Sequence, residues 1–395
     1  MSARFVLSAL LLSGVRVHAL STGSATSAAR PTLAPRCRRS VAVASPPRSA
    51  LAQHSEDDSE DDSEPLPADI AVALPRPSSL LRVLWRFSRP HTMLGSAVCI
   101  PALTLYAAPA GAALSLPLLQ GVLYALPAAL LMNVYITGLN QLLDIEIDRI
   151  NKPDLPLASG ELSPFAGSLL VAGALVLSLG LGWWHPWLST NALRITLLGS
   201  AVLGTLYSAP PFRLKRFPLL ASACIITVRG ALVNWGFCAH AISVAAAAAG
   251  SLPSAALGWS SLPLRCWAPV GFFSLFGLVI ALLKDVPDIK GDRQFGIRSF
   301  SVRIGAAAVL RLGLNLLTTT LALTGVALGA AATLAPTAAL AVRRLAVSLA
   351  CAASVVAIRR RAASVSPDDP PAVYALYMEL WKYFYGAYLC LPFAR

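Results

Sequence analysis

Residues 117–148 read PLLQGVLYALPAALLMNVYITGLNQLLDIEID, an apolar run that ends in a cluster of acids. Positions 117–139 carry no charge. At about 1.5 Å per residue, a helix of that length crosses the roughly 30 Å hydrocarbon core of a bilayer. Similar apolar stretches predict spans at 92–110, 117–139, 163–184, 191–209, 218–244, 266–284, 305–330, 335–357 and 372–392. The sequence therefore predicts an all-α membrane protein, a bundle of about nine transmembrane helices.

The composition agrees with a membrane protein and excludes a soluble globular enzyme. Of the 395 residues, 56% are hydrophobic and 13% are charged, and the mean hydropathy is +0.65. In a soluble protein the net charge of +13 would suggest nucleic acid as a partner. Here apolar runs separate the basic residues, which is typical of loops at a membrane face. We therefore expect membrane lipid as a partner and no nucleic acid.

The chain divides into three predicted regions: a targeting region at 1–50, a disordered acidic linker at 51–80, and a transmembrane domain at 81–395. The first 19 residues have the layout of a secretory signal, and the acid-free stretch up to residue 50, rich in Ser, Ala, Arg and Pro, is typical of a transit peptide. A signal followed by a transit segment resembles the two-part address of plastids of secondary origin. We expect an integral membrane protein of the plastid, in the envelope or thylakoid; a tail without any address is the alternative.

The basic residues are distributed unequally between the two ends of the predicted bundle. The segment before the first span and the loops after the second, fourth, sixth and eighth spans hold 17 of the 25 Lys and Arg residues that follow position 70. Such asymmetry sets membrane orientation. It predicts that these segments face the stroma.

Acids gather in two short segments at helix ends on this basic side. Eight of the 11 acids after position 70 fall within 144–161 and 285–292. Asn140, Asp144 and Asp148 are four residues apart, which places them on one face of a regular helix. The acids of the second segment, at 285, 288 and 292, also share a helical face, although Pro287 must kink or cap the helix there. Intramembrane acids are costly and indicate a functional site.

Paired carboxylates without His or Cys select a hard cation, magnesium or calcium, over zinc or copper. Magnesium commonly binds one or two carboxylates together with substrate phosphates, so two facing acidic segments predict a site for a diphosphate. Basic residues of the same loops are candidates to contact the phosphate oxygens. They are Lys152, Arg213, Lys215, Lys284, Lys290 and Arg293.

The two acidic segments resemble the two signatures of the UbiA-type intramembrane aromatic prenyltransferases. Residues 140–148 fit Asn-Gln-x-x-Asp-x-x-x-Asp, and residues 284–292 fit Lys-Asp-x-x-Asp-x-x-Gly-Asp. The resemblance covers roughly residues 82–395. It implies a bundle of nine transmembrane helices and the magnesium-dependent transfer of a prenyl group from its diphosphate to an aromatic ring.

Further segments resemble the homogentisate branch of this superfamily. They are Arg-Pro-His-Thr at 89–92, the run from 151 to 161 that ends in Ala-Ser-Gly-Glu, and the aromatic segment at 381–393. The Ala-Ser-Gly-Glu ending is similar to phytyltransferases of tocopherol biosynthesis, whereas solanesyltransferases of plastoquinone biosynthesis tend to carry Ala-Gly-Asp there. Phytyl or geranylgeranyl transfer is therefore favoured, and solanesyl transfer is the alternative. Asp154 departs from the branch, where an aromatic residue or His is expected.

The resemblance also implies roles for individual residues. Magnesium ligands are Asp144, Asp148 and Asp285 with Asp288 or Asp292, and Asn140 completes the catalytic set. Lys152, Arg213 and Lys284 hold the diphosphate, the Tyr207 ring attracts the allylic cation, and Arg229 and Asn234 belong to the substrate-binding set. Homogentisate loses its carboxylate as it is prenylated.

Other classes of protein share some of these features. Intramembrane acids also mark ion transporters and divalent-cation channels, which need acids at mid-membrane. A protein that only binds prenyl diphosphate is a third class. Chlorophyll synthases and hydroxybenzoate prenyltransferases would share the metal site but differ in the flanking segments.

Overall fold

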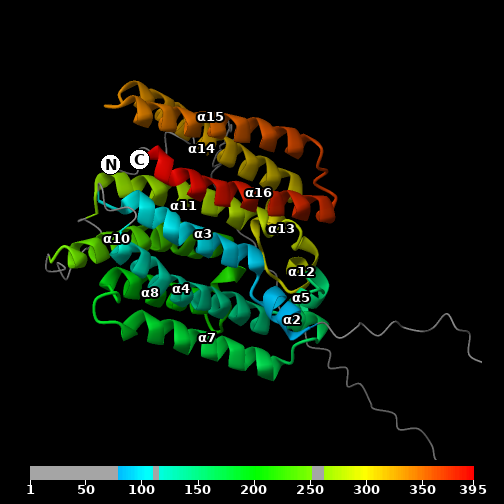
Figure 1. Ribbon diagram of the computed structural model, residues 1–395. Helices are drawn as coiled ribbons and strands as arrows, with labels where there is room; N and C mark the ends of the chain where they lie inside the picture. Colours follow the sequence, from blue (N-terminus) through cyan, green and yellow to red (C-terminus); the bar gives the residue numbers. More distant parts are fainter. Residues whose placement is uncertain (1–78, 110–114, 251–261) are drawn as a thin grey trace, which may run out of the picture. The chain divides into compact units, whose positions relative to one another are not determined.

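The computed structural model describes residues 79–109, 115–250 and 262–395, and Figure 1 shows its helices. These ranges contain helices and no strand, so the predicted all-α class is confirmed. The predicted targeting region and almost all of the predicted acidic linker lie outside the described residues.

Nine long helical segments within the described ranges correspond one to one to the predicted spans. They are α3 (Pro90–Ala107), α4 (Leu116–Leu143), α7 (Pro164–Trp184), α8 (Asn191–Ser208), the continuous segment of α9 (Pro218–Ile225), η3 (Ile226–Leu232) and α10 (Val233–Ala248), α11 (Trp267–Leu283), α14 (Ala306–Thr333), α15 (Ala338–Ala363) and α16 (Pro370–Cys390).

Six of these segments are long and apolar enough to cross a membrane: α4, α7, the α9–α10 segment, α11 with the preceding η5 (Leu264–Cys266), α14 and α15. The other three, α3, α8 and α16, have at least 18 residues but are more polar. The membrane character of the fold is confirmed, whereas membrane crossing by all nine segments stays a prediction.

Several long helices begin at side-chain caps. Ser163, Thr190, Thr337 and Asp369 each accept a hydrogen bond from the backbone N–H three residues further on, at the starts of α7, α8, α15 and α16. Proline follows the cap in α7 and α16, where its missing N–H costs nothing. These polar N-cap residues set the starts of the helices between the apolar runs.

The long helices pack around α4 and α11. Helix α4 contacts α3, α7 and α8, while α11 contacts η3 and α14. Helices α14 and α15 pair as a hairpin. Large apolar side chains such as Val176, Leu323 and Leu349 are exposed on the outer helices, as expected for surfaces that face lipid. The final helix α16 and the short η6 (Leu391–Ala394) lie against α3.

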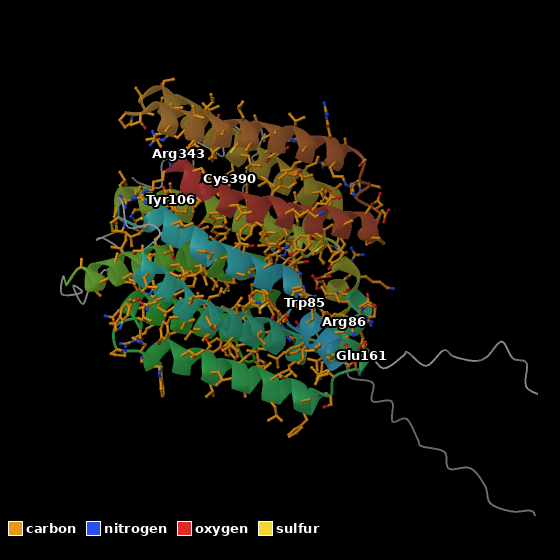
Figure 2. All side chains as sticks on the ribbon, viewed as in Figure 1. Trp85, Arg86, Tyr106, Glu161, Arg343 and Cys390 are labelled. Carbon is orange, nitrogen blue, oxygen red and sulfur yellow. The ribbon has the colours of Figure 1, made fainter. Side chains whose placement is uncertain are left out.

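Six of the short helices gather at one end of the bundle. They are α2 (Leu80–Phe87), α5 (Ile145–Asn151), α6 (Pro156–Ser159), η2 (Leu214–Arg216), α12 (Ile289–Gln294) and α13 (Phe300–Ile304). Figure 1 shows α2, α5, α12 and α13 together at this end. Arg86 of α2 forms an ion pair with Glu161 there, whereas Tyr106, Arg343 and Cys390 lie at the opposite end (Figure 2). Both acidic motifs are in this group of short helices.

A π-helical segment, η3, interrupts the span between α9 and α10. Its Gly230 lies against α11: a Cβ at this position would be 2.3 Å from Ser274 Oγ and 2.4 Å from Ser274 Cα. Single-turn π segments are rare and occur often at functional sites. Here Gly230 permits the backbones of η3 and α11 to approach closely, as small residues do in membrane bundles.

Gly230→Ala is expected to lower the thermal unfolding midpoint of the purified protein, because α11 must move away from the new Cβ, and such overpacking costs roughly 1–3 kcal/mol. Gly173→Ala on α7 is the matched control, since nothing lies within 4 Å of its Cβ position. The control should unfold at or above the wild-type temperature. Equal midpoints for the two variants would contradict this close approach.

Candidate active site

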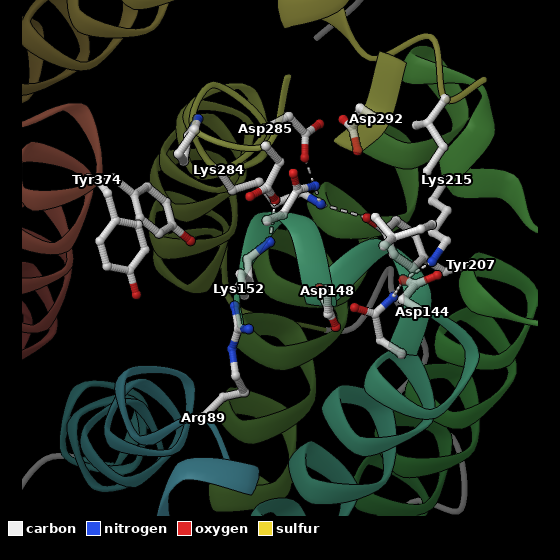
Figure 3. A pocket seen from close by; sticks show the side chains of 17 residues that line it. Arg89, Asp144, Asp148, Lys152, Tyr207, Lys215, Lys284, Asp285, Asp292 and Tyr374 are labelled. Carbon is white, nitrogen blue, oxygen red and sulfur yellow. Dashed lines mark hydrogen bonds and ion pairs between the residues drawn. The ribbon is translucent and has the colours of Figure 1, made fainter. Parts of the chain in front are cut away.

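The two acidic motifs face one another across a cavity of about 120 Å³ at the end of the bundle that carries the short helices. Figure 3 shows charged side chains from separate helices converging on it. The polar residues of its wall are Arg89, Asn140, Asp144, Asp148, Asn151, Lys152, Tyr207, Lys215, Lys284, Asp285, Asp288, Asp292, Tyr374 and Tyr377. The structure therefore brings together all five predicted metal ligands, Asn140, Tyr207 and three of the six predicted phosphate-binding cations.

The first motif is not one regular helix, which differs from the prediction made from its four-residue spacing. Helix α4 ends at Leu143, Asp144 has φ −123° and ψ 17°, and α5 begins at Ile145. Asn140 nevertheless stays beside Asp144, because its Nδ2 donates to Asp144 Oδ2 at 3.0 Å. The break turns the chain, and Asp148 still lines the same cavity.

The second motif is broken as well, and Pro287 lies in the break. Helix α11 ends at Leu283, and α12 begins at Ile289 with Asp288 at its N-cap position. Proline cannot continue a helix because it lacks the N–H and its ring clashes with the preceding turn. The acids of this motif therefore reach the cavity from a turn and from α12, not from one helical face.

A contact between the two motifs, absent from the sequence-based prediction, holds α5 against α12. The N–H of Gly291 donates to Asn151 Oδ1 at 2.9 Å, and a Cβ at position 291 would lie 2.5 Å from that oxygen. A larger residue at position 291 would push the two short helices apart. The glycine of the second signature thus has a packing function.

Lysines already pair with three of the five carboxylates. Asp144 pairs with Lys215 and, at 2.9 Å, with Arg213. Lys152 of the first motif pairs with Asp288 of the second. Lys284 Nζ lies 3.2 Å from Asp285 Oδ1 and donates to the Tyr207 hydroxyl at 2.6 Å. These pairs link α5, α8, η2, α11 and α12 around the cavity.

Asp148 and Asp292 form no ion pair within the described ranges. Burial raises the pKa of Asp148 to about 6; Asp144 adds to this rise, while Lys152 opposes it. Burial also raises the pKa of Asp292 to about 7, and its acidic neighbours contribute. Charge on these two carboxylates is therefore costly until a cation approaches.

The donor set fits a hard cation that shares its ligands with a bound substrate. Among the described residues, no group of three His, Cys, Asp or Glu side chains could hold a metal ion alone. The cavity instead offers carboxylates from two opposed segments, an arrangement that suits Mg²⁺, which keeps several positions for water or phosphate oxygen.

Five predicted site residues are not in the wall of this cavity. Arg213 contacts it only through its ion pair with Asp144, and Arg229 lines a neighbouring chamber. Lys290 and Arg293 are exposed on α12, and neither belongs to the wall. Asn234 is fully buried in α10, where it donates to the backbone carbonyls of Arg229 and Gly230 and accepts from the Tyr388 hydroxyl at 3.0 Å. These contacts give Asn234 a structural role in holding η3.

Two further cavities adjoin the first. An inner chamber of about 200 Å³ extends among the long helices and shares Arg89, Asn140, Tyr207, Lys284 and Tyr377 with the charged cavity. An outer cavity of about 420 Å³ shares a different set with it, and Asp154 is in its wall. The shared outer residues are Arg89, Asn151, Lys152, Pro287, Asp288 and Tyr374. The outer cavity and the inner chamber also share Arg89 and His91, so the three spaces adjoin one another around Arg89.

Residues 98–383 match the UbiA prenyltransferase family. The chain belongs to this family. Among UbiA relatives, a probable chloroplastic homogentisate phytyltransferase 1 of Oryza sativa subsp. japonica is 39% identical over 80% of this chain and 74% of its own. A homogentisate geranylgeranyltransferase of Hordeum vulgare is 37% identical over 80% of this chain and 73% of its own.

A chloroplastic homogentisate solanesyltransferase of Arabidopsis thaliana is 39% identical over a shorter part, 59% of this chain and 57% of its own. Among solved structures, a UbiA homolog from Archaeoglobus fulgidus bound to GPP and Mg²⁺ superposes with a TM-score of 0.51 at 17% identity and covers 78% of this chain and 99% of that one. That likeness shows the UbiA fold.

Asp144→Ala is expected to destabilise the protein by roughly 3–5 kcal/mol, because it leaves the buried Lys215 ammonium without its carboxylate. Adding Lys215→Met should restore part of the thermal unfolding midpoint. Asp148→Asn is the control, since it breaks no ion pair, and should unfold like the wild type. A stable Asp144→Ala single variant would show that the pair does not anchor this end of the bundle.

Proposed function

We propose that this UbiA family member is a Mg²⁺-dependent homogentisate prenyltransferase that transfers a phytyl or geranylgeranyl group from its diphosphate to homogentisate with loss of the acceptor's carboxylate, a step of tocopherol biosynthesis. The observation that carries the proposal is the pair of acidic motifs facing one another across a lysine-rich cavity that continues into an apolar chamber. The names of the similar phytyl- and geranylgeranyltransferases support the choice of substrates.

The charges of the cavity wall suit a diphosphate bound with divalent cations. Five carboxylates and four Lys or Arg side chains line it, so that its formal charge is −1 when every group is ionised. Two divalent ions and a diphosphate with about three negative charges would bring the total to zero, and Mg²⁺ binds such mixed sets of carboxylate and phosphate oxygen. A wall of acids alone would repel the diphosphate.

Asp144, Asp148 and Asp285, with Asp288 or Asp292, are the residues that would hold Mg²⁺. When bound, the metal stabilises negative charge on the departing diphosphate. Lys152, Lys215 and Lys284 each reach the same cavity and can exchange a carboxylate partner for a phosphate oxygen. Such preorganised charge stabilises the transition state more than the ground state.

The inner chamber suits the allylic group that remains after ionisation. Ile136, Leu203, Val228 and Ile280 contribute to its wall, and apolar walls exclude the water that would quench an allylic cation. Tyr207 lies where the charged cavity and the chamber meet, with Lys284 Nζ 5.3 Å from its ring centroid. Tyr207 therefore positions Lys284, and attraction of the allylic cation to the same ring stays a prediction.

The geometry favours an enzyme over an ion transporter. Transport would need acids at mid-membrane, whereas both acidic motifs lie among the short helices at one end of the bundle (Figure 1). We further propose a plastid membrane location, envelope or thylakoid, reached through a signal plus transit peptide. The chloroplastic names of the relatives support the plastid.

Asp148→Asn is expected to reduce prenyl transfer at least a hundredfold, because it removes a metal-binding charge at a position that makes no ion pair. The measurement is product formation by mass spectrometry from homogentisate and phytyl diphosphate in saturating Mg²⁺. Glu146→Gln is the matched control: Glu146 is exposed and pairs only with Arg149 among the described residues. Wild-type activity in Asp148→Asn would remove this residue from the metal site.

Phytyl, geranylgeranyl and solanesyl diphosphates offered in competition are expected to yield mainly phytylated or geranylgeranylated product. The solanesyltransferase resembles a smaller part of the chain than the other two relatives do. Chelation of Mg²⁺ should stop the formation of every product, and added Mg²⁺ should restore it. Solanesyl product in excess would instead support the plastoquinone branch.

A further inference from the structure

Arg229 is a cation inside the bundle that has no carboxylate partner among the described residues. It lies on η3 within the membrane-span candidate Pro218–Ala248 and lines the inner chamber. None of the ion pairs found in the described ranges includes it. An ionised side chain at this depth is costly, so it is a candidate to bind something.

The neighbours of Arg229 hold its guanidinium in place without neutralising it. Its Nη2 donates to Asn133 Oδ1 at 3.3 Å, and its guanidinium carbon lies 5.2 Å from the centroid of the Trp381 ring. Asn133 is fixed in turn, because its Nδ2 donates to Thr92 Oγ1 at 2.9 Å. A guanidinium has five N–H donors, so most of them are left for a ligand.

The helix opposite Arg229 leaves room for this arrangement. A Cβ at Gly95 of α3 would lie 3.3 Å from Arg229 Nη1 and 3.4 Å from Trp381 Cζ3. A side chain at position 95 would therefore press against both the guanidinium of Arg229 and the indole ring of Trp381. Arg229 is thus placed over an aromatic face by contacts from α3, α4 and α16.

The diphosphate is a poor candidate for the partner of Arg229. It would have Lys152, Lys215 and Lys284 in the charged cavity, whose wall does not include Arg229. The chamber beside Arg229 combines apolar and aromatic side chains, which suits a ring that carries an anionic group. An uncompensated positive charge there would also repel the allylic cation, whereas a carboxylate bound to Arg229 would cancel it.

We propose that Arg229 binds the carboxylate of the aromatic acceptor, so that the inner chamber selects an acidic hydroquinone over a neutral one. This inference rests on the proposed function, since it names the acceptor subsite of that reaction. Guanidinium and carboxylate form two parallel hydrogen bonds, which would orient the ring as well as hold it.

Arg89 is the other arginine of the chamber, and its surroundings differ. It also lines the charged cavity (Figure 3), where its charge acts on Asp148. Five carboxylates share that cavity wall with Arg89, whereas the wall of the inner chamber contains no Asp or Glu, and the outer cavity reaches Arg89 too. Arg89 therefore lies on the path of an anionic acceptor, while Arg229 lies at the end of that path.

The test compares Arg229→Gln with the wild type on homogentisate and on methylhydroquinone, which lacks the carboxylate. We expect the KM for homogentisate to rise roughly ten- to hundredfold, the range for a lost hydrogen bond to a charged group. The KM for the prenyl diphosphate should stay unchanged. The wild type should use homogentisate with the lower KM, and Arg229→Gln should lose that preference.

Arg194→Gln is the matched control. Arg194 also lies in a long helix, donates to Ser189 Oγ at 2.9 Å and stands 5.8 Å from the Trp183 ring centroid, but it lines none of the three cavities. It should leave both KM values at their wild-type levels. Arg229→Lys, which keeps the charge without the planar fork, should show a smaller rise for homogentisate alone.

An unchanged homogentisate KM in Arg229→Gln, or a rise confined to the prenyl diphosphate, would overturn the carboxylate site. If Arg229→Gln fails to fold, kinetics of the wild type still test the carboxylate site. Equal KM values of the wild type for homogentisate and methylhydroquinone would overturn it as well. Absence of homogentisate turnover in the wild type would contradict the proposed function itself. Turnover in the wild type with an unmoved KM in the variant contradicts the acceptor subsite only.

Discussion

Five carboxylates face one cavity at the end of the bundle, and they repel one another. The surrounding structure must compensate this repulsion with positive charge. Lysines that are distant in the sequence from their partners supply this charge. Lys215 pairs with Asp144, 71 positions earlier, and Lys152 pairs with Asp288, 136 positions later. Each pair joins two segments that are distant in the sequence. The end of the bundle is therefore held by charge, while the long helices are held by apolar packing.

Much of the fold could be predicted because it depends on local properties. The length of each apolar run gave nine long helices with ends within a few residues, including the turn that separates α14 from α15. The charged loops likewise mark the end where the short helices gather. Whether α3, α8 and α16 cross the membrane does not follow from hydropathy, because these three helices are less apolar than the other six.

The site was predictable in its composition and not in its geometry. Spacing alone placed Asn140, Asp144 and Asp148 on one helix, yet a four-residue spacing is also compatible with a break at Asp144. The contact of Asn151 with Gly291 and the contact of Arg229 with Asn133 depend on which helices become neighbours. Lys290 and Arg293 show the converse, since residues adjacent to a motif in sequence can point away from it.

The charged cavity adjoins both the outer cavity and an apolar chamber among the long helices, and this has a kinetic consequence. Under the proposed function, a water-soluble acid enters through the outer cavity, whereas a long-chain donor arrives by diffusion within the bilayer. The effective concentration of the donor is then its mole fraction in the membrane. Diluting the vesicles should scarcely alter the saturation of the enzyme with the donor, while enriching them with inert lipid should lower it. Saturation with the acceptor should instead fall on dilution and change little when inert lipid is added.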